Sequence, residues 1–199
     1  MNQDPYSGRF EGLLLDPAEA VGMSAAGKVN AAVLVPLYVQ DGTLTAVFTK
    51  RPADMRRHAG EISFPGGRQD PGEELRDTAL REAEEEIGLM RDLVDVVGAL
   101  PPTGTFVTNY VIYPFVGLTA PGGAFRPNPV EVDEIVELSL PDLIAGYERK
   151  RLIRRGVPIK TDTYTVGAHF IWGATARILA GLVDRLEKGR ISSAGNPGG

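Results

Sequence analysis

Three glutamates, Glu82, Glu85 and Glu86, follow Arg81 in one short acidic segment of this sequence. On an α-helix successive side chains rotate by about 100°, so the three carboxylates would share one arc of the helix surface. Like charges at this spacing destabilise an exposed helix by about 0.2–0.5 kcal/mol per pair, and by more where solvent is excluded. A hard divalent cation would remove the repulsion, and Mg²⁺ or Mn²⁺ suits oxygen ligands better than Zn²⁺ does. An ordinary solvated acidic helix face is the alternative that the carboxylates alone leave open.

The residues around these glutamates make the metal hypothesis more specific. Seven identities stand at fixed spacing in Gly67-x5-Glu73-x7-Arg81-Glu82-x2-Glu85-Glu86-x-Gly88. With about 7% usage per residue type, a chance match is expected about once in 10⁸ windows. The segment resembles the signature box of the Nudix hydrolases, enzymes that hydrolyse a nucleoside diphosphate linked to another group. The resemblance implies an α/β fold, the Nudix-type α/β/α sandwich with a mixed β-sheet between helices.

The same resemblance implies roles for individual residues. The metal ligands would be the carboxylates of Glu82, Glu85 and Glu86 and the backbone carbonyl of Gly66. Arg81 would orient the glutamates together with Glu73, a role that is compatible with a plain structural ion pair. Bound Mg²⁺ or Mn²⁺ neutralises a pyrophosphate, polarises a phosphoryl oxygen and lowers the pKa of a bound water.

A general base must also take the proton from the attacking water. Nudix enzymes often place a further glutamate on a loop after the box, and here two glutamates follow a loop rich in glycine and proline. Glu131 is the first choice and Glu134 the second, while an acidic strand edge is the alternative for both. Glu82 or Glu85 could also serve as the base.

The loop before the box suggests a substrate. It is similar to the pattern of the coenzyme A diphosphatase branch of the Nudix family at Thr49, Arg51, Arg56, Gly60, Phe64, Pro65, Gly66 and Gly67. The segment Phe170–Ala176 is also similar to that branch. The resemblance implies that coenzyme A or its thioesters are cleaved to 3′,5′-ADP and (acyl-)4′-phosphopantetheine.

The substrate residues expected from this loop are Arg51, Arg56, Arg57, Gly60 and Phe64. Arginines form forked hydrogen bonds to phosphate, and coenzyme A carries a 3′-phosphate besides its pyrophosphate. Alternatively, one or two of these arginines pair with nearby acids. The rival substrates are ADP-ribose, dinucleotides and damaged nucleotides. A non-catalytic, nucleotide-sensing module is disfavoured because all three box carboxylates are present.

The pattern of apolar and turn-forming residues predicts the elements that position these groups. Helices are expected over Glu74–Ile87, stopped by Gly88, and over Trp172–Lys188, ended by Gly189, with short helices after Asp16 and at Pro141. Strands are expected over Ala31–Val39, Leu44–Lys50, Ile62–Phe64, Leu93–Leu100, Val107–Leu118 and Glu134–Leu138, with a hairpin around Gly156. We therefore expect an N-terminal extension over 1–27, one Nudix domain over 28–189 and a disordered tail over 190–199.

Composition limits the partners. The 199 residues carry a net charge of −5, which disfavours broad electrostatic binding to nucleic acid. No apolar run approaches the roughly 20 residues of a membrane span, and no signal peptide is apparent. The chain has no cysteine, which excludes disulfides and thiolate metal sites. We expect a cytoplasmic protein with a small-molecule nucleotide substrate, no nucleic-acid or membrane partner, and a possible homodimer.

Overall fold

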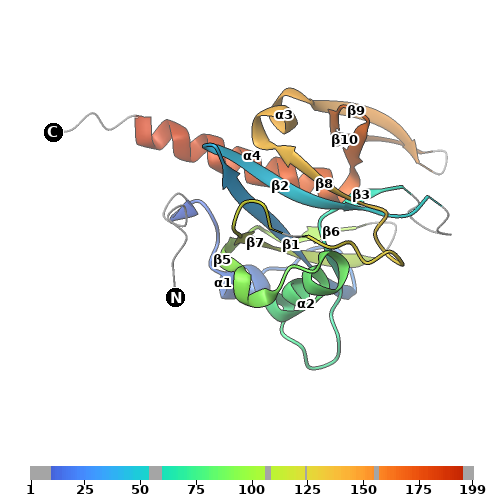
Figure 1. Ribbon diagram of the computed structural model, residues 1–199. Helices are drawn as coiled ribbons and strands as arrows, with labels where there is room; N and C mark the ends of the chain where they lie inside the picture. The colour runs from blue at the N-terminus through green and yellow to red at the C-terminus, as the bar shows by residue number, and fades with distance from the viewer. Residues whose placement is uncertain (1–9, 54–59, 106–108, 124, 155–156, 195–199) are drawn as a thin grey trace.

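The computed structural model describes residues 10–53, 60–105, 109–123, 125–154 and 157–194 (Figure 1). The helices are α1 (Pro17–Gly22), α2 (Leu75–Ile87), α3 (Leu140–Ala145), α4 (Gly173–Ala194) and the 3-10 turn η2 (Arg91–Leu93). The strands are β1 (Val29–Gln40), β2 (Thr43–Lys50), β3 (Ile62–Ser63), β4 (Gly66–Arg68), β5 (Asp95–Ala99), β6 (Thr103–Gly104), β7 (Tyr110–Leu118), β8 (Glu134–Ser139), β9 (Tyr147–Arg154), β10 (Val157–Val166) and β11 (His169–Trp172). Within these residues, eight strands form one sheet and three form a second.

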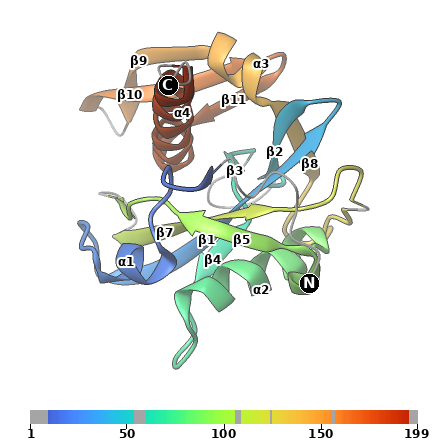
Figure 2. The same cartoon turned by 90° about the vertical axis from the view of Figure 1, so that its left-hand side faces the viewer.

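The main sheet is mixed, because β1 runs parallel to β7 and antiparallel to β2. Side chains of β1 alternate between the two faces, as a strand requires. Leu34 and Tyr38 belong to the apolar cluster that includes α2, whereas Val35 and Leu37 belong to the cluster that includes α4. Figure 2 shows α1 and α2 along one face of the sheet and α4 on the other side. The expected α/β/α sandwich is therefore confirmed.

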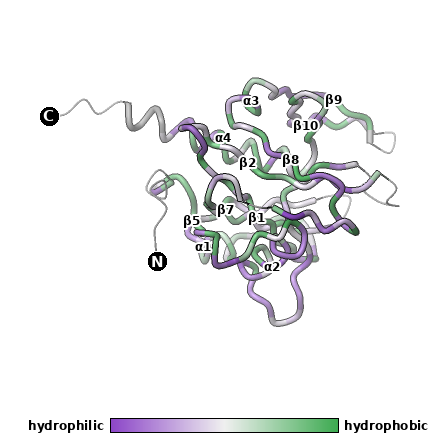
Figure 3. Tube along the Cα trace, viewed as in Figure 1, coloured by the Kyte–Doolittle hydropathy of each residue, from purple (hydrophilic) through white to green (hydrophobic). Residues whose placement is uncertain are grey.

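Local sequence explains the elements nearest to the acidic segment. Asp41 and Gly42 both have positive φ, 51° and 77°, as the turn between β1 and β2 requires. Ala83 and Ile87 are fully buried on the inner face of α2, and Gly88 ends the helix in the left-handed conformation at φ 67°. Figure 3 shows that the strands of the main sheet are largely hydrophobic, whereas the loop between β4 and α2 is hydrophilic.

The last helix differs from the prediction. It begins at Gly173, because Trp172 is the last residue of β11, and it continues past Gly189 to Ala194. A Cβ at Gly189 would lie 2.6 Å from Leu13 Cδ2, so the glycine permits close packing of the N-terminal segment rather than ending the helix. Residues 190–194 of the predicted tail are thus helical, and residues 195–199 lie outside the described part.

The second sheet contains the predicted hairpin, with Arg154 opposite Val157, and adds β11 beside β10. Strands β4, β6 and β11 were not predicted, and the strand predicted over Leu93–Leu100 is divided between η2 and β5. The first residues of the strand predicted from Val107 lie outside the described residues. In the described part of the chain, no helix combines the length and apolar character that crossing a membrane requires.

Candidate metal and active site

Two glycines let the backbone of β4 approach the carboxylates of α2. A Cβ at Gly66 would overlap the carbonyl of Ala32 on β1, and a Cβ at Gly67 would overlap the carboxylate of Glu82. The Gly66 N–H donates to Glu86 Oε2 at 3.4 Å. The short strand therefore brings its backbone against two of the predicted metal ligands, with no room for side chains between them.

Glu86 is a buried carboxylate, with only 4% of its surface exposed. Burial is the main cause that raises its pKa to about 8, and the charge of Glu82 adds to the increase. The Gly66 N–H and the charge of Arg51 act in the opposite direction. Burial also raises the pKa of Glu82, against the effect of Arg81. Two adjacent, desolvated carboxylates form a donor set that fits a hard divalent cation.

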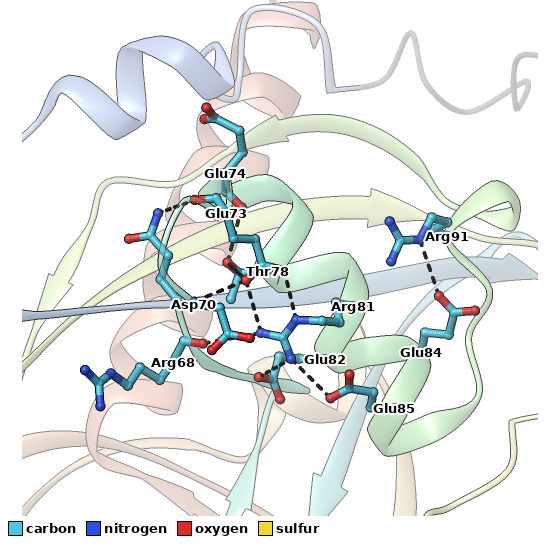
Figure 4. Close-up of polar contacts among 11 residues, drawn as sticks. Arg68, Asp70, Glu73, Glu74, Thr78, Arg81, Glu82, Glu84, Glu85 and Arg91 are labelled. Carbon is cyan, nitrogen blue, oxygen red and sulfur yellow. Dashed lines mark hydrogen bonds and ion pairs between the residues drawn. The ribbon is translucent and has the colours of Figure 1, made fainter.

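Arg81 organises the outer side of this cluster (Figure 4). Its Nε and Nη2 donate to the two oxygens of Glu73 at 2.9 and 3.1 Å. Its Nη1 donates to Glu82 Oε1 at 2.8 Å and to Glu85 Oε2 at 3.1 Å. The guanidinium also reaches the carbonyl of Arg68 at 3.3 Å. One side chain therefore links the loop before α2 to two predicted metal ligands.

Glu73 is held in place in turn. Arg81 is the main cause that lowers the pKa of Glu73 to about 2. Thr78 Oγ1 donates to Glu73 Oε2 at 2.7 Å, and Thr78 itself is fully buried. Glu73 and Arg81 thus form a forked ion pair, as expected, and the buried Thr78 that completes it was not predicted.

The carboxylates of the box do not converge on one point. Within the described residues, no group of three or more histidines, cysteines or acids already has a metal-binding arrangement. Arg81 occupies oxygens of Glu82 and Glu85, and the side chain of Glu85 is 55% exposed. Glu86 lies on the inner side and Glu85 on the outer side of α2. The predicted ligands therefore share one helix arc but differ in their surroundings.

The two candidates for the general base have different environments. The charge of Glu131 contributes to the raised pKa of both Glu82 and Glu86, so its carboxylate lies near enough to act on both. Glu134 instead accepts from Lys50 Nζ at 2.8 Å and lies 3.1 Å from His169 Nε2. These two partners lower the pKa of Glu134. Glu134 is therefore already engaged by Lys50 and His169, whereas no such partner holds the Glu131 carboxylate among the described residues.

The predicted substrate residues are only partly described. Arg51 Nε is buried and has no hydrogen-bond partner among the described residues, and the Arg51 carbonyl accepts from the Gly60 N–H at 3.2 Å. Phe64 is 2% exposed and stacks on Phe48 with ring centroids 4.6 Å apart. Phe64 thus packs in the core and supports the loop from inside. Arg56 and Arg57 lie outside the described residues.

Comparisons with known proteins point to one family. A family model described as NUDIX domain matches residues 28–156. An "Uncharacterized Nudix hydrolase NudL" from Photorhabdus laumondii subsp. laumondii is 37% identical over 161 residues, covering 79% of this chain and 85% of that protein. A protein of the same name from Cronobacter sakazakii is 35% identical over 182 residues, covering 90% of this chain and 92% of that protein.

Two solved structures share the fold. A MutT/nudix family protein from Enterococcus faecalis has a TM-score of 0.58 at 14% identity, covering 94% of this chain and 75% of that one. RenU, a Nudix hydrolase from M. smegmatis, has a TM-score of 0.53 at 15% identity, covering 92% of this chain and 95% of that one. Because the family model covers well over half of the sequence, this chain belongs to the Nudix hydrolase family, whose members act on nucleoside diphosphate derivatives.

Proposed function

We propose that this chain is a Mg²⁺- or Mn²⁺-dependent hydrolase of coenzyme A or its thioesters, giving 3′,5′-ADP and (acyl-)4′-phosphopantetheine. The observation that carries the substrate proposal is Arg51. Its Nε is buried without a hydrogen-bond partner in the described part of the chain, and its charge acts on Glu86. A guanidinium whose buried Nε has no partner among the described residues, next to predicted metal ligands, is suited to bind a substrate phosphate.

The proposed metal ligands are Glu82, Glu85, Glu86 and the carbonyl of Gly66. The bound cation would neutralise the pyrophosphate and lower the pKa of a bound water. Glu86 contributes a carboxylate whose burial favours exchange of a proton for a metal ion. Arg81, fixed by Glu73, keeps Glu82 and Glu85 on the same side of α2.

Glu131 is the proposed general base. It would take the proton from water as the water oxygen attacks phosphorus and the P–O–P linkage breaks in line on the opposite side. The leaving phosphate carries the displaced electron pair. Glu131 suits this role better than Glu134, because Lys50 and His169 already hold the Glu134 carboxylate.

The proposed role of Arg51, together with Arg56 and Arg57 of the same loop, is to bind phosphates of the substrate. Coenzyme A offers one phosphate more than ADP-ribose does, on its 3′ position. A loop with three arginines in seven residues matches that additional charge. The same loop would give little advantage on a substrate that lacks the 3′-phosphate.

The test is a substrate panel with Mg²⁺ and with Mn²⁺, with products identified by mass. It covers coenzyme A, acyl-coenzyme A, 3′-dephospho-coenzyme A, ADP-ribose, NADH and nucleoside triphosphates. We expect coenzyme A or its thioesters to give the highest kcat/KM, above 3′-dephospho-coenzyme A. A clear preference for ADP-ribose would overturn the substrate proposal.

Arg51→Ala, with Arg91→Ala as the matched control, tests the role of the arginine. Arg91 is exposed and pairs with Glu84 at 3.4 Å, away from the predicted ligands. Arg51→Ala should lower kcat/KM for coenzyme A by about 10-fold to 100-fold, the equivalent of one or two charge-assisted hydrogen bonds. Equal losses of kcat/KM in Arg51→Ala and Arg91→Ala would show that Arg51 does not bind the substrate.

A further inference from the structure

The loop that carries Glu131 is attached to the C-terminal end of α2. The last carbonyls of a helix have no partner within the helix. Here the Arg126 N–H donates to the carbonyl of Ile87 at 2.8 Å, and the Asn128 N–H donates to the carbonyl of Glu86 at 2.9 Å. Glu86 therefore directs its side chain to the proposed metal site and its backbone to the loop that carries the proposed base.

Asn128 then closes a turn that ends at Glu131. Its Oδ1 accepts from the Val130 N–H at 3.1 Å, and its carbonyl accepts from the Glu131 N–H at 3.0 Å and the Val132 N–H at 2.8 Å. Asparagine at the first position and proline at the second, here Pro129, are the residues that such a turn favours. Val132 is 2% exposed, so the far side of the turn is anchored by burial.

The turn works against a repulsion. Glu131 follows Asn128 by three residues, the Asn128 N–H is bonded to the Glu86 carbonyl, and the charge of Glu131 contributes to raising the pKa of both Glu82 and Glu86. Among the described residues, no hydrogen bond or ion pair holds the Glu131 carboxylate itself, and Val130 next to it is 75% exposed. The backbone of the turn therefore sets where Glu131 lies relative to the end of α2.

We propose that Asn128 is a positioning residue. It fixes where Glu131 lies relative to the C-terminal end of α2, and so aligns the proposed general base with the proposed metal ligands. This inference rests on the proposed role of Glu131 but not on the identity of the substrate. A residue with no side chain in the acidic cluster would then affect proton transfer. A misplacement of about 1 Å in a reacting group can lower a rate by about 100-fold.

The test compares Asn128→Ala with Asn128→Ser, on whichever member of the substrate panel the wild type turns over fastest. Asn128→Ala removes the acceptor of the Val130 N–H, whereas serine supplies a hydroxyl that accepts the same bond more weakly. Asn128→Ala should lower kcat by about 10-fold to 100-fold and leave KM and Mn²⁺-dependent stabilisation unchanged. Asn128→Ser should recover most of the loss. Val130→Ala, in the same turn but with an exposed side chain, is the matched control and should keep wild-type kcat.

A double-mutant cycle separates positioning from general structural damage. Glu131→Gln alone should lower kcat by about 10²–10⁴-fold. If Asn128 acts through Glu131, adding Asn128→Ala to Glu131→Gln should lower kcat no further. A full additional loss in the double variant would overturn the inference while leaving Glu131 as the base.

The remaining outcomes are also distinct. Near-normal turnover by Glu131→Gln would refute both the base and its positioning residue, although the hydrolase activity itself would stand. If Asn128→Ala folds poorly, as judged by circular dichroism at the assay temperature, Pro129→Ala gives a second route. That variant keeps the Asn128 side chain but loosens the turn, and a kcat equal to that of the wild type would count against the inference.

Discussion

Neutralising Glu86 should stabilise the metal-free protein at neutral and alkaline pH. The carboxylate is 4% exposed, lies near Glu82 and receives one long hydrogen bond, 3.4 Å from the Gly66 N–H. Glu86→Gln keeps the shape of the side chain and an oxygen that can accept this bond. It removes the charge whose burial is unfavourable in the absence of a cation.

The magnitude follows from the raised pKa of Glu86, about 8 in the folded protein against a reference value of 4.5. Below pH 4.5 the group is protonated in both states, so its contribution to stability is fully present there. As pH rises to about 8, the unfolded chain loses this proton first, and stability falls by about 1.4 kcal/mol per pH unit. At pH 7 the effect reaches at most about 3 kcal/mol.

The assay is thermal unfolding in EDTA across pH 5–9, followed by circular dichroism. For a protein of this size 1 kcal/mol corresponds to about 2–4 °C, so Glu86→Gln should exceed the wild-type Tm by several degrees at pH 8 and by little at pH 5. Glu85→Gln is the matched control, because its side chain is 55% exposed and should give little pH-dependent gain. Mg²⁺ should raise the Tm of the wild type more at pH 8 than at pH 5. In Glu86→Gln the increase in Tm caused by Mg²⁺ should not differ in this way between the two pH values. A Glu86→Gln variant no more stable than the wild type at pH 8 would refute the reasoning.

Three further predictions concern the residues around this carboxylate. A lysine at position 81 cannot reproduce the forked contacts of the arginine, so Arg81→Lys should lower kcat by about 100-fold with a smaller change in KM. Near-normal kcat in steady-state assays would contradict the orienting role of Arg81. The pKa of Glu73 is lowered to about 2, so its contribution to stability is present above pH 4.5 and is lost as pH falls towards 2. In urea unfolding, the free energy of unfolding of Glu73→Gln should therefore decline less over that range than that of the wild type. Parallel declines in the two proteins would count against the ion pair. Gly67→Ala would place a methyl group on the Glu82 carboxylate and should abolish Mn²⁺-dependent stabilisation in thermal melts. Gly22→Ala is the control, because a Cβ there meets no atom within 4 Å, and it should keep that stabilisation. Equal Mn²⁺-dependent stabilisation of the two variants would argue against the close approach of Gly67 to Glu82.

Local pattern was sufficient to predict the helix that carries the acidic segment. Its buried stripe and the left-handed Gly88 follow from spacing and from the conformational freedom of glycine. Gly189 is also a glycine near the expected end of a helix, but it does not end α4. Its missing Cβ instead makes room for Leu13 from the N-terminal segment. A glycine that permits a long-range contact cannot be distinguished from a helix stop by its neighbours in sequence.

The candidate site shows the same division. The three glutamates and Arg81 were selected through the family resemblance of the segment, but their different environments were not predicted. The burial of Glu86 depends on β4, a three-residue strand that pairs with β1 and was not predicted. Glu131 was already preferred to Glu134 from the sequence, but the ion pair that holds Glu134 was not predicted, because its partner Lys50 lies 84 positions away in sequence.

Crystals soaked with Mn²⁺ and a slowly hydrolysed substrate analogue would test the metal site most directly. The prediction is an anomalous difference peak bonded to carboxylate oxygens of Glu82, Glu85 and Glu86, with Glu131 facing it. A fully occupied analogue with no such peak beside these side chains, or with Mn²⁺ bound elsewhere, would contradict the proposed chemistry.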